Sequence, residues 1–341
     1  MNPTRLVICY NPGKNIRYCP KGLGITALNI QKYMRSNGFN CEVWPIAGGD
    51  VLESILALPK NESVTHVVVQ APWIPTSWFQ SIALKYVNIK FACTSHSNVG
   101  FLQAESQAIT LLRQYADLAL LLPNFFCAGN NEPFCNWMKN AYGRACLYLP
   151  NLYFIDPKIP QPAHPLWNGG TLRIGCFGAG RAYKNFQSAV AAAVLVSRQL
   201  KATTEIWLNS GRTDGHGNIV WNSATATTEN LTPGVSLEPL KWSEWPAFRS
   251  LVSNMHLLMQ PSFTESFNNV TADGILEGVP SVVSSAIRFV PSTWIADSDD
   301  VNDIATKARH LISDIHAADE GMAALRAWNA AGFVQWVEFL S

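Results

Sequence analysis

Several protein classes are excluded by what this sequence lacks. Its eight cysteines include no C-x-x-C pair, so we expect neither a disulfide framework nor a structural zinc site. No apolar run approaches the roughly 18 residues that a membrane-spanning helix needs, and the five apolar residues after Arg5 are too few for a signal peptide. We therefore expect a soluble, cytoplasmic protein with free thiols and no bound metal.

The chain also has little net charge. The formal net charge is +1 and only 14% of the 341 residues are charged, so no global field attracts the chain to nucleic acid or to a membrane. The first 168 residues hold 13 Lys and Arg against 8 Asp and Glu, whereas the rest hold 12 against 16. A basic first half fits an anionic partner, although ordinary solvated surface gives the same imbalance. Hydrophobic residues make up 48%, which excludes disorder.

Short apolar runs alternate with helical patterns along most of the chain. Runs typical of strands cover 6–10, 41–46, 66–70, 89–94, 118–122, 172–177, 205–209, 235–237, 256–260 and 281–284. Helix-like periodicity covers 27–37, 107–115, 185–200, 245–254, 269–277, 301–315 and an aromatic-rich stretch at 323–340. This alternation predicts an α/β protein whose parallel sheets are covered on both faces.

A segment with four prolines, 157–165, divides this pattern, because it fits neither a central strand nor a helix interior. We predict one Rossmann-like domain over 1–165, a second over 166–322, and a helix over 323–341 that packs back on the first. Each half opens with a strand, a glycine loop and a helix. The glycines are Gly22 and Gly24 in the first half and Gly178 and Gly180 in the second. Neither loop completes G-x-G-x-x-G, which disfavours a redox enzyme, and the expected ligand site is a cleft where the two sheets face each other.

The most specific segment runs from Gln260 to Pro280. A strand ends near Pro261, a loop presents Glu265, and a helix begins near Asn268 or Asn269. The free N–H groups of a helix N-terminus suit a phosphate, and the carboxylates of Glu265 and Asp273 suit hydroxyl groups. This pattern predicts a site for a sugar on one side of a diphosphate and a ribose on the other. The alternatives are that Glu265 only complements the helix dipole and that Asp273 is solvated.

Two cations, Arg181 and Lys184, follow the second glycine loop. An enzyme that expels a nucleoside diphosphate must stabilise the growing negative charge, and fixed cations can do this in place of a metal ion. Ordinary surface charges at a helix start are the alternative.

These residues resemble the retaining, family-4 type of GT-B glycosyltransferase. The second half carries most of the similarity, through the elements Gly178–Lys184, Pro261-Ser262-x-x-Glu265 with a second carboxylate at Asp273, Gly278-x-Pro280 and 300–305. The first half contributes the Gly22–Gly24 loop, His96 after an apolar strand, and Leu149-Pro150-Asn151. Three features depart from the family. The spacing of Arg181 and Lys184 is tighter than is common. Asp273 stands where Glu is usual, and Ser266-Phe267-Asn268 replaces Gly-Phe-Gly, Asn being tolerant of unusual backbone angles.

The resemblance implies a role for each matching residue. Glu265 would contact hydroxyls of the donor sugar, Asp273 would hold the ribose, and Arg181 with Lys184 would bind the diphosphate, helped by the N–H groups of Asn268 and Asn269. His96 would lie beside the transferred sugar, with a satisfied core histidine as the alternative. Gly22, Gly24 and Gly180 would let the loops approach the donor. The resemblance further implies a retaining, metal-independent transfer from a nucleoside-diphosphate sugar, a UDP-sugar being the first expectation, without a cofactor.

The acceptor is expected on the first domain. Lys14, Arg17 and Lys21 with the interleaved Tyr18 suit phosphates and a stacked base, and Trp73 with Trp78 adds stacking surface. A solvated loop and a packed turn are the alternatives. Candidate acceptors are a glycan, a lipid-linked sugar and a nucleic acid with hydroxymethylated bases. The lack of an obvious amphipathic basic helix disfavours a membrane-surface acceptor. A nucleotide-sugar epimerase and a binding protein without turnover remain open as other functions.

Overall fold

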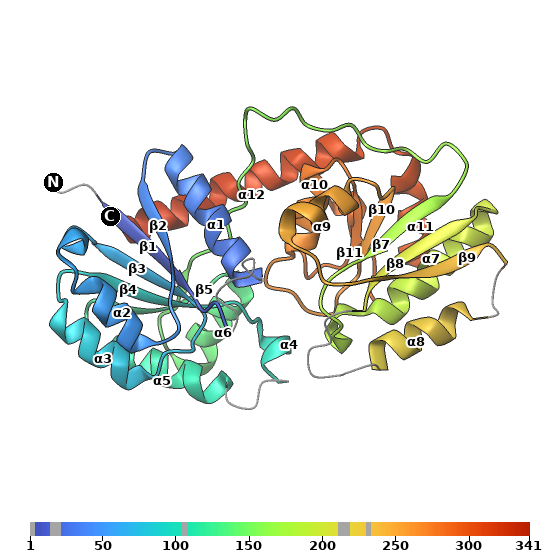
Figure 1. Ribbon diagram of the computed structural model, residues 1–341. Helices are drawn as coiled ribbons and strands as arrows, with labels where there is room; N and C mark the ends of the chain where they lie inside the picture. Colours follow the sequence, from blue (N-terminus) through green and yellow to red (C-terminus); the bar gives the residue numbers. More distant parts are fainter. Residues whose placement is uncertain (1–3, 14–21, 104–107, 211–218, 230–232) are drawn as a thin grey trace. The chain divides into compact units, whose positions relative to one another are not determined.

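The computed structural model describes residues 4–13, 22–103, 108–210, 219–229 and 233–341. The chain forms two compact units (Figure 1). Unit 1 comprises Met1–Ile155 and Trp328–Ser341, and unit 2 comprises Asp156–Ala327. Each unit is built around a parallel sheet, so the predicted α/β class is confirmed. Within the described ranges no helix is both long and apolar enough to cross a membrane.

Unit 1 has a six-stranded sheet with the order β2-β1-β3-β4-β5-β6. Its strands are β1 (Arg5–Tyr10), β2 (Asn40–Pro45), β3 (His66–Gln70), β4 (Lys90–Ser95), β5 (Phe125–Gly129) and β6 (Leu147–Tyr148). The connecting helices are α1 (Gly22–Ser36), α2 (Gly49–Leu56), α3 (Thr76–Lys85), α4 (Val99–Leu102), α5 (Ala108–Leu121) and α6 (Glu132–Tyr142). The C-terminal part of α12 (Ala317–Leu340) completes the unit.

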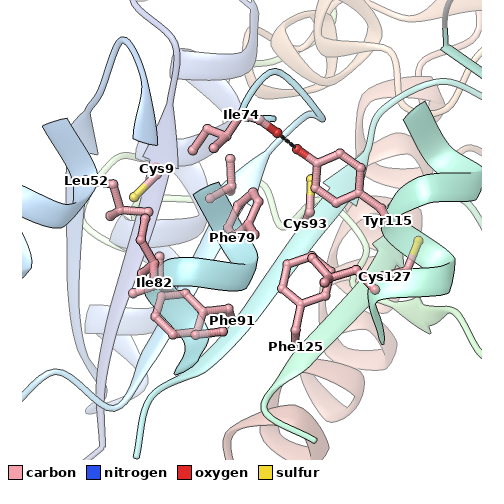
Figure 2. Packing of buried hydrophobic residues seen from close by; sticks show 14 of the residues in the cluster. Cys9, Leu52, Ile74, Phe79, Ile82, Phe91, Cys93, Tyr115, Phe125 and Cys127 are labelled. Carbon is pink, nitrogen blue, oxygen red and sulfur yellow. Dashed lines mark hydrogen bonds between the residues drawn. The ribbon is translucent and has the colours of Figure 1, made fainter. Parts of the chain in front are cut away.

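Both faces of the unit 1 sheet are apolar, because a parallel sheet is covered on both sides. Leu6 and Ile8 of β1 face a cluster with α1 and Trp336 of α12. Val7 and Cys9 face the opposite cluster, which packs α2, α3, α5 and α6 (Figure 2). Alternate residues of one strand thus serve two cores, as the period of two in a strand requires.

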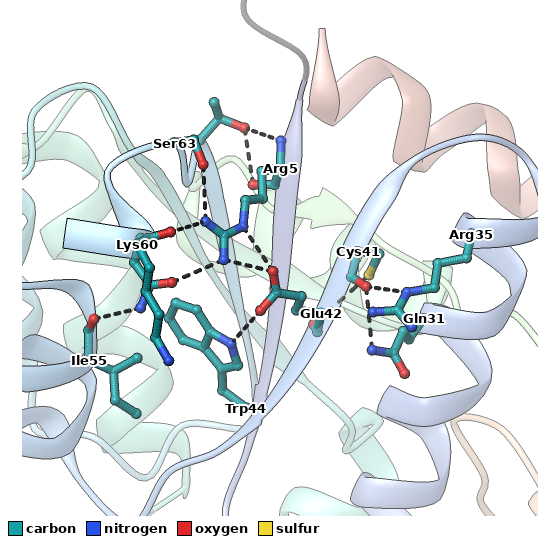
Figure 3. A network of polar contacts seen from close by, with 11 residues as sticks. Arg5, Gln31, Arg35, Cys41, Glu42, Trp44, Ile55, Lys60 and Ser63 are labelled. Atoms are coloured by element: carbon teal, nitrogen blue, oxygen red, sulfur yellow. Dashed lines mark hydrogen bonds and ion pairs between the residues drawn. The ribbon is translucent and has the colours of Figure 1, made fainter. Parts of the chain in front are cut away.

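Arg5 ties together the ends at which β1, β2 and β3 begin. Its Nε donates to Glu42 Oε1 at 2.9 Å, and its Nη1 donates to the carbonyl oxygen of Lys60 at 2.7 Å (Figure 3). Burial alone raises the pKa of Glu42, but hydrogen bonds from Trp44 and Arg5 outweigh burial and leave this pKa lowered. The guanidinium of Arg5 is therefore a structural clamp at this edge of the sheet.

Unit 2 has a five-stranded parallel sheet with the order β11-β10-β7-β8-β9. Its strands are β7 (Leu172–Cys176), β8 (Thr204–Asn209), β9 (Val235–Leu240), β10 (Leu257–Gln260) and β11 (Ser281–Val283). Its helices are α7 (Phe186–Leu200), α8 (Ile219–Thr228), α9 (Trp245–Val252), α10 (Asn269–Leu276), α11 (Val301–Ser313) and the first part of α12. The units divide at 155/156 and 327/328, compared with the predicted 165/166 and 322/323.

The proline-rich segment at 157–165 is packed against unit 2. His164 is buried, and its ring nitrogens contact the carbonyl oxygens of Asp314 and His256 at 3.0 and 3.2 Å. Gly278 lies directly beneath the segment, because a Cβ at this position would lie 2.6 Å from the carbonyl oxygen of Pro162. The glycine of the Gly278-x-Pro280 motif is therefore required by close packing and by its φ of +74°.

One predicted strand is wrong. Residues 118–121 form the last turn of α5, and the strand begins only at Phe125. A short apolar run does not distinguish a buried strand from a helix end, and here the run has the helical conformation.

Candidate functional site

The two motifs of unit 2 meet at the carboxyl edge of its sheet. β7 leads into the glycine loop, β10 leads into the Glu265 loop, and these strands are neighbours. Gln260 Nε2 donates to the carbonyl oxygen of Phe177 at 3.0 Å, and the N–H of Phe263 donates to the carbonyl oxygen of Tyr183 at 2.9 Å. The two loops therefore form one continuous surface, although they are some 80 residues apart in sequence.

Lys184 and Glu265 form an ion pair at the centre of this surface. Their side chains are 17% and 10% exposed. The same carboxylate oxygen of Glu265, Oε1, also accepts from Ser262 Oγ at 2.9 Å and from Asn268 Nδ2 at 3.0 Å. Three donors thus fix the carboxylate, so its position is set before any ligand arrives.

Asn268 connects this carboxylate to the start of α10. Its Oδ1 accepts from the N–H of Thr271 at 2.9 Å, which makes it the N-cap, and its Nδ2 also reaches Gln260 Oε1 at 3.1 Å. Its φ of −107° is ordinary extended backbone, so Asn is present here for its side chain and not for tolerance of unusual angles. Asn269 begins the helix, and no acidic residue occupies the first turn. An anion is therefore electrostatically favoured at this end of α10.

The glycine loop adopts a backbone conformation that favours glycine. Gly178 has a φ of +129°, and its N–H donates to Asn209 Oδ1 at 2.7 Å. A Cβ at Gly178 would lie 3.7 Å from Lys184 Cε, so the glycine faces the lysine side chain. Gly180 is buried, and Arg181 after it is partly exposed. Asn185 Nδ2 then donates to the carbonyl oxygens of Pro261 and Ser298 at 3.0 and 2.8 Å, which holds the turn in place.

Asp273 is more deeply buried than is expected for a side chain that contacts a ribose. It is 2% exposed, and its Oδ1 accepts from the indole N–H of Trp245 at 2.8 Å. One turn further along each helix, Arg249 of α9 pairs with Glu277 of α10. Two charge-assisted contacts therefore hold α9 against α10.

Unit 1 has a chain of polar side chains at the carboxyl edge of its own sheet. His96 Nε2 donates to Gln70 Oε1 at 2.5 Å, and Asn130 Nδ2 donates to His96 Nδ1 at 3.0 Å and to Asn151 Oδ1 at 3.2 Å. Because an amide oxygen only accepts and an amide nitrogen only donates, these contacts require a neutral His96 protonated at Nε2. Burial lowers the pKa of His96 to about 4, which agrees with this protonation state.

Strain and unsatisfied donors accompany this chain. Ala71, directly after Gln70, has a φ of +119°, a conformation that is costly for a residue with a Cβ. Gln70 Nε2 and Thr94 Oγ1 are buried and have no hydrogen-bond partner within the described part of the chain. Such features gather at functional sites, so they support a ligand-responsive role for this edge.

The other predicted residues of unit 1 lie before α1, in the first turn of α1 and after β3. Lys14, Arg17, Tyr18 and Lys21 lie outside the described residues. Gly22 opens α1 and Gly24 is buried in its first turn; a Cβ at Gly22 would meet no atom of the described chain within 4 Å. Trp73 packs against the unit 1 core, as the packed-turn alternative expects.

Sequence reasoning missed several residues of these sites. Gln70, Asn130 and Asn151 lie at the ends of different strands, and Trp245 reaches Asp273 from another helix. The triplet Asp297-Ser298-Asp299 is a D-x-D motif, which is commonly used to bind metal. Here Asp297 Oδ1 accepts from the N–H of Asp299 at 2.9 Å and closes a local turn. No group of three or more His, Cys, Asp or Glu side chains suited to a metal ion occurs among the described residues.

No protein-family model and no curated protein sequence matches the chain. The structure is similar to a sucrose-phosphate synthase from Thermosynechococcus elongatus, with a TM-score of 0.68, 12% identity and coverage of 98% of both chains. A UDP-forming alpha,alpha-trehalose-phosphate synthase from Burkholderia xenovorans in complex with glucose-6-phosphate gives a TM-score of 0.61 and 11% identity over 98% of this chain and 99% of that one. A variant of S. aureus TarM, in complex with fondaparinux, alpha-GlcNAc-glycerol and UDP, gives 0.60 and 13% over 86% and 59%. The chain therefore has the GT-B fold, as the resemblance implies.

Proposed function

We propose that this protein is a retaining, metal-independent glycosyltransferase that moves a sugar from a nucleoside-diphosphate sugar to an acceptor hydroxyl. The ion pair between Lys184 and Glu265 carries this proposal, because it joins the two motifs at the carboxyl edge of one sheet. The GT-B fold supports the same assignment. The loops of Lys184 and Glu265, which are far apart in the sequence, thus meet at the carboxyl edge of a parallel sheet, where open α/β folds bind ligands.

Unit 2 binds the donor. The diphosphate lies at the N-terminus of α10, where the N–H groups of Asn268 and Asn269 and the cations of Arg181 and Lys184 stabilise its charge. The carboxylate of Glu265 accepts hydrogen bonds from hydroxyls of the sugar. Asp273 acts at the ribose end of the donor through Trp245, from whose indole N–H its carboxylate accepts a hydrogen bond.

The reaction requires charge stabilisation more than a strong base. As the glycosidic bond to the diphosphate breaks, negative charge grows on the leaving oxygen, and Lys184 and Arg181 lower its energy. The acceptor hydroxyl attacks from the face that the diphosphate leaves, and the departing phosphate oxygen takes its proton. In unit 1, His96 is held neutral and in a fixed orientation by Gln70 and Asn130.

UDP-sugars are the first donors to test, because two of the similar structures carry UDP in their titles. Those titles also include a sugar phosphate and a glycerol glycoside, so small phosphorylated sugars join the acceptors to test. Glycans, lipid-linked sugars and hydroxymethylated nucleic acid complete the set.

The first experiment is a thermal-shift panel of UDP, GDP, ADP, CDP and NAD, each without metal and with Mg²⁺. A ligand at about 100 times its Kd adds roughly 2.7 kcal/mol of stability. We expect one diphosphate to raise Tm equally with and without Mg²⁺, and NAD to have no effect. The Lys184→Ala variant should lose the shift, whereas Arg309→Ala, an exposed cation on α11, should keep it.

Turnover is then measured as diphosphate release with donor alone and with donor plus acceptor. Release that depends on an acceptor supports the transferase, whereas release from donor alone with an inverted sugar carbon indicates an epimerase. A diphosphate shift without any turnover indicates a binding protein. A shift that requires Mg²⁺ contradicts the metal-independent mechanism.

A further inference from the structure

Unit 1 exposes four large apolar side chains at the ends of two neighbouring helices. Leu84 and Val87 lie at or just after the end of α3, and Leu120 and Leu121 end α5; all four are between 60% and 72% exposed. We call these four residues the apolar tip. They are adjacent, because Asn124 Nδ2, just after α5, donates to the carbonyl oxygens of Ala83 and Ile89 at 3.1 and 3.0 Å.

The apolar tip lies at the amino edge of the unit 1 sheet. Connecting helices run antiparallel to the strands of a parallel sheet, so their last turns lie beside the strand starts. His96 and its partners are at the other edge. Strands of five or six residues put about 17–20 Å between the two edges. The apolar tip is therefore separate from the candidate site.

Cations occur on the helices that carry the apolar tip and on neighbouring α6. Four of them, Lys85, Arg113, Lys139 and Arg144, belong to α3, α5, α6 and the turn after α6. Three of these cations form ion pairs, Lys85 with Glu53, and Arg113 and Arg144 with Asp117, so two carboxylates accompany the four cations. Arg5 is not counted here, because its guanidinium is held inside the network of Figure 3. The net charge of this set is 4 − 2 = +2, so the surface around the apolar tip favours an anionic partner.

The size of the apolar tip favours a lipid surface over a second copy of the chain. Four side chains of this kind expose on the order of 400 Å², about half of the roughly 800 Å² that each partner buries in a stable dimer. Insertion into a bilayer interface requires no complementary surface, and a few leucines together with basic residues suffice for reversible binding. Insertion removes the leucine side chains from water, and this burial of apolar surface stabilises the bound state.

We propose that unit 1 binds anionic membranes peripherally through Leu84, Val87, Leu120 and Leu121 and the basic residues beside them. The four side chains enter the interface between headgroups and acyl chains, and the cations contact lipid phosphates. In this orientation the amino edge of the sheet faces the bilayer and the carboxyl edge with His96 faces away. This inference does not depend on the proposed transfer reaction.

The test is co-sedimentation of the full chain with vesicles of phosphatidylcholine alone and of phosphatidylcholine mixed with phosphatidylglycerol. We expect binding only to the anionic vesicles, and weaker binding as salt is added. The double variant Leu120→Ser/Leu121→Ser should lower the partition coefficient at least about tenfold. Because both side chains are exposed, Tm should be unchanged. Ile159→Ser/Ile315→Ser is the matched control, since those residues of unit 2 are 64% and 65% exposed, and it should bind as the wild type does.

Three results would overturn the proposal. The first is an absence of binding to anionic vesicles by a wild-type chain with a normal Tm. The second is equal loss of binding in the matched control, which would indicate non-specific adsorption. The third is a dimer in sedimentation velocity that the Leu120→Ser/Leu121→Ser variant dissociates, which would show that the apolar tip is a protein interface.

Discussion

Replacing Glu265 by alanine perturbs the candidate site at its most connected atom. Oε1 of Glu265 accepts from Lys184, Ser262 and Asn268, so the variant leaves one cation and two neutral donors without this acceptor. Breaking a mostly buried ion pair costs about 3–5 kcal/mol. Partial solvation of Lys184 reduces the expected loss to about 3 kcal/mol, which lowers Tm by several degrees. Glu265→Gln keeps an acceptor oxygen and should cost about 1 kcal/mol.

The activity of the two variants separates charge from shape. If the carboxylate contacts the sugar and balances the lysine beside the diphosphate, both variants lower kcat on the order of 100-fold, as loss of a preorganised electrostatic group does. The assay is diphosphate release at saturating donor, below the Tm of each variant. Glu277→Ala is the control, because it removes a comparable ion pair with Arg249 at the C-terminal end of α10 and lies outside the site. It should lose stability and retain kcat.

Two results would refute this reasoning. An unchanged Tm in Glu265→Ala would mean that the three donors do not depend on this carboxylate. A near-wild-type kcat in a folded Glu265→Ala protein would mean that the carboxylate has no part in the reaction, whatever its contribution to stability.

Three further predictions concern histidines, a glycine and an amide. Burial lowers the pKa values of His66 and His96 to about 4 from 6.5, so the stability that each neutral ring contributes is complete above about pH 6.5 and decreases as pH falls toward 4. The loss from His96 amounts to roughly 3 kcal/mol, and the loss from His66 is smaller because of solvent screening. In urea unfolding, the free energy of unfolding of His66→Gln should decrease less between pH 6.5 and pH 4 than that of the wild type. Gly278→Ala should cost about 2 kcal/mol or more in thermal unfolding, because its Cβ meets the Pro162 carbonyl; an unchanged Tm would contradict the observed packing. Asn130→Ala removes the donor to Nδ1 of His96, so ¹⁵N chemical shifts should show a mixture of tautomers, with kcat reduced more than KM is changed; a fixed tautomer would exclude this positioning role.

The part of the candidate site in unit 2 is largely predictable from local sequence. Strand, loop and helix around Glu265 follow one another within a few residues, and Asn268 is a residue type that caps helices. The loops of Lys184 and Glu265 meet because both follow strands of one parallel sheet, and the carboxyl ends of such strands share an edge.

The polar chain around His96 is not predictable in this way. Gln70, His96, Asn130 and Asn151 follow four different strands, and only the strand order makes them neighbours. Sequence patterns identify strands but do not give their order in the sheet.

The error at 118–122 has a different cause. An apolar run is taken to be buried, but Leu120 and Leu121 end a helix and are exposed. Exposed apolar side chains at a helix end do not follow the rule that relates apolar sequence to the core.

Helix α12 has a consequence for how the chain folds during synthesis. Its last residues complete a unit that otherwise consists of the first 155 residues: Trp336 Nε1 donates to the carbonyl oxygen of Pro150 at 2.8 Å, and Asn329 bonds the backbone of Tyr153 at both its N–H and its carbonyl. The core on one face of the unit 1 sheet is therefore incomplete until α12 has been synthesised. Its residues Leu6, Ile8 and Ala27 pack in one cluster with Trp336 of α12. A nascent chain that stalls before α12 therefore leaves the apolar face of unit 1 that Trp336 covers exposed to chaperones.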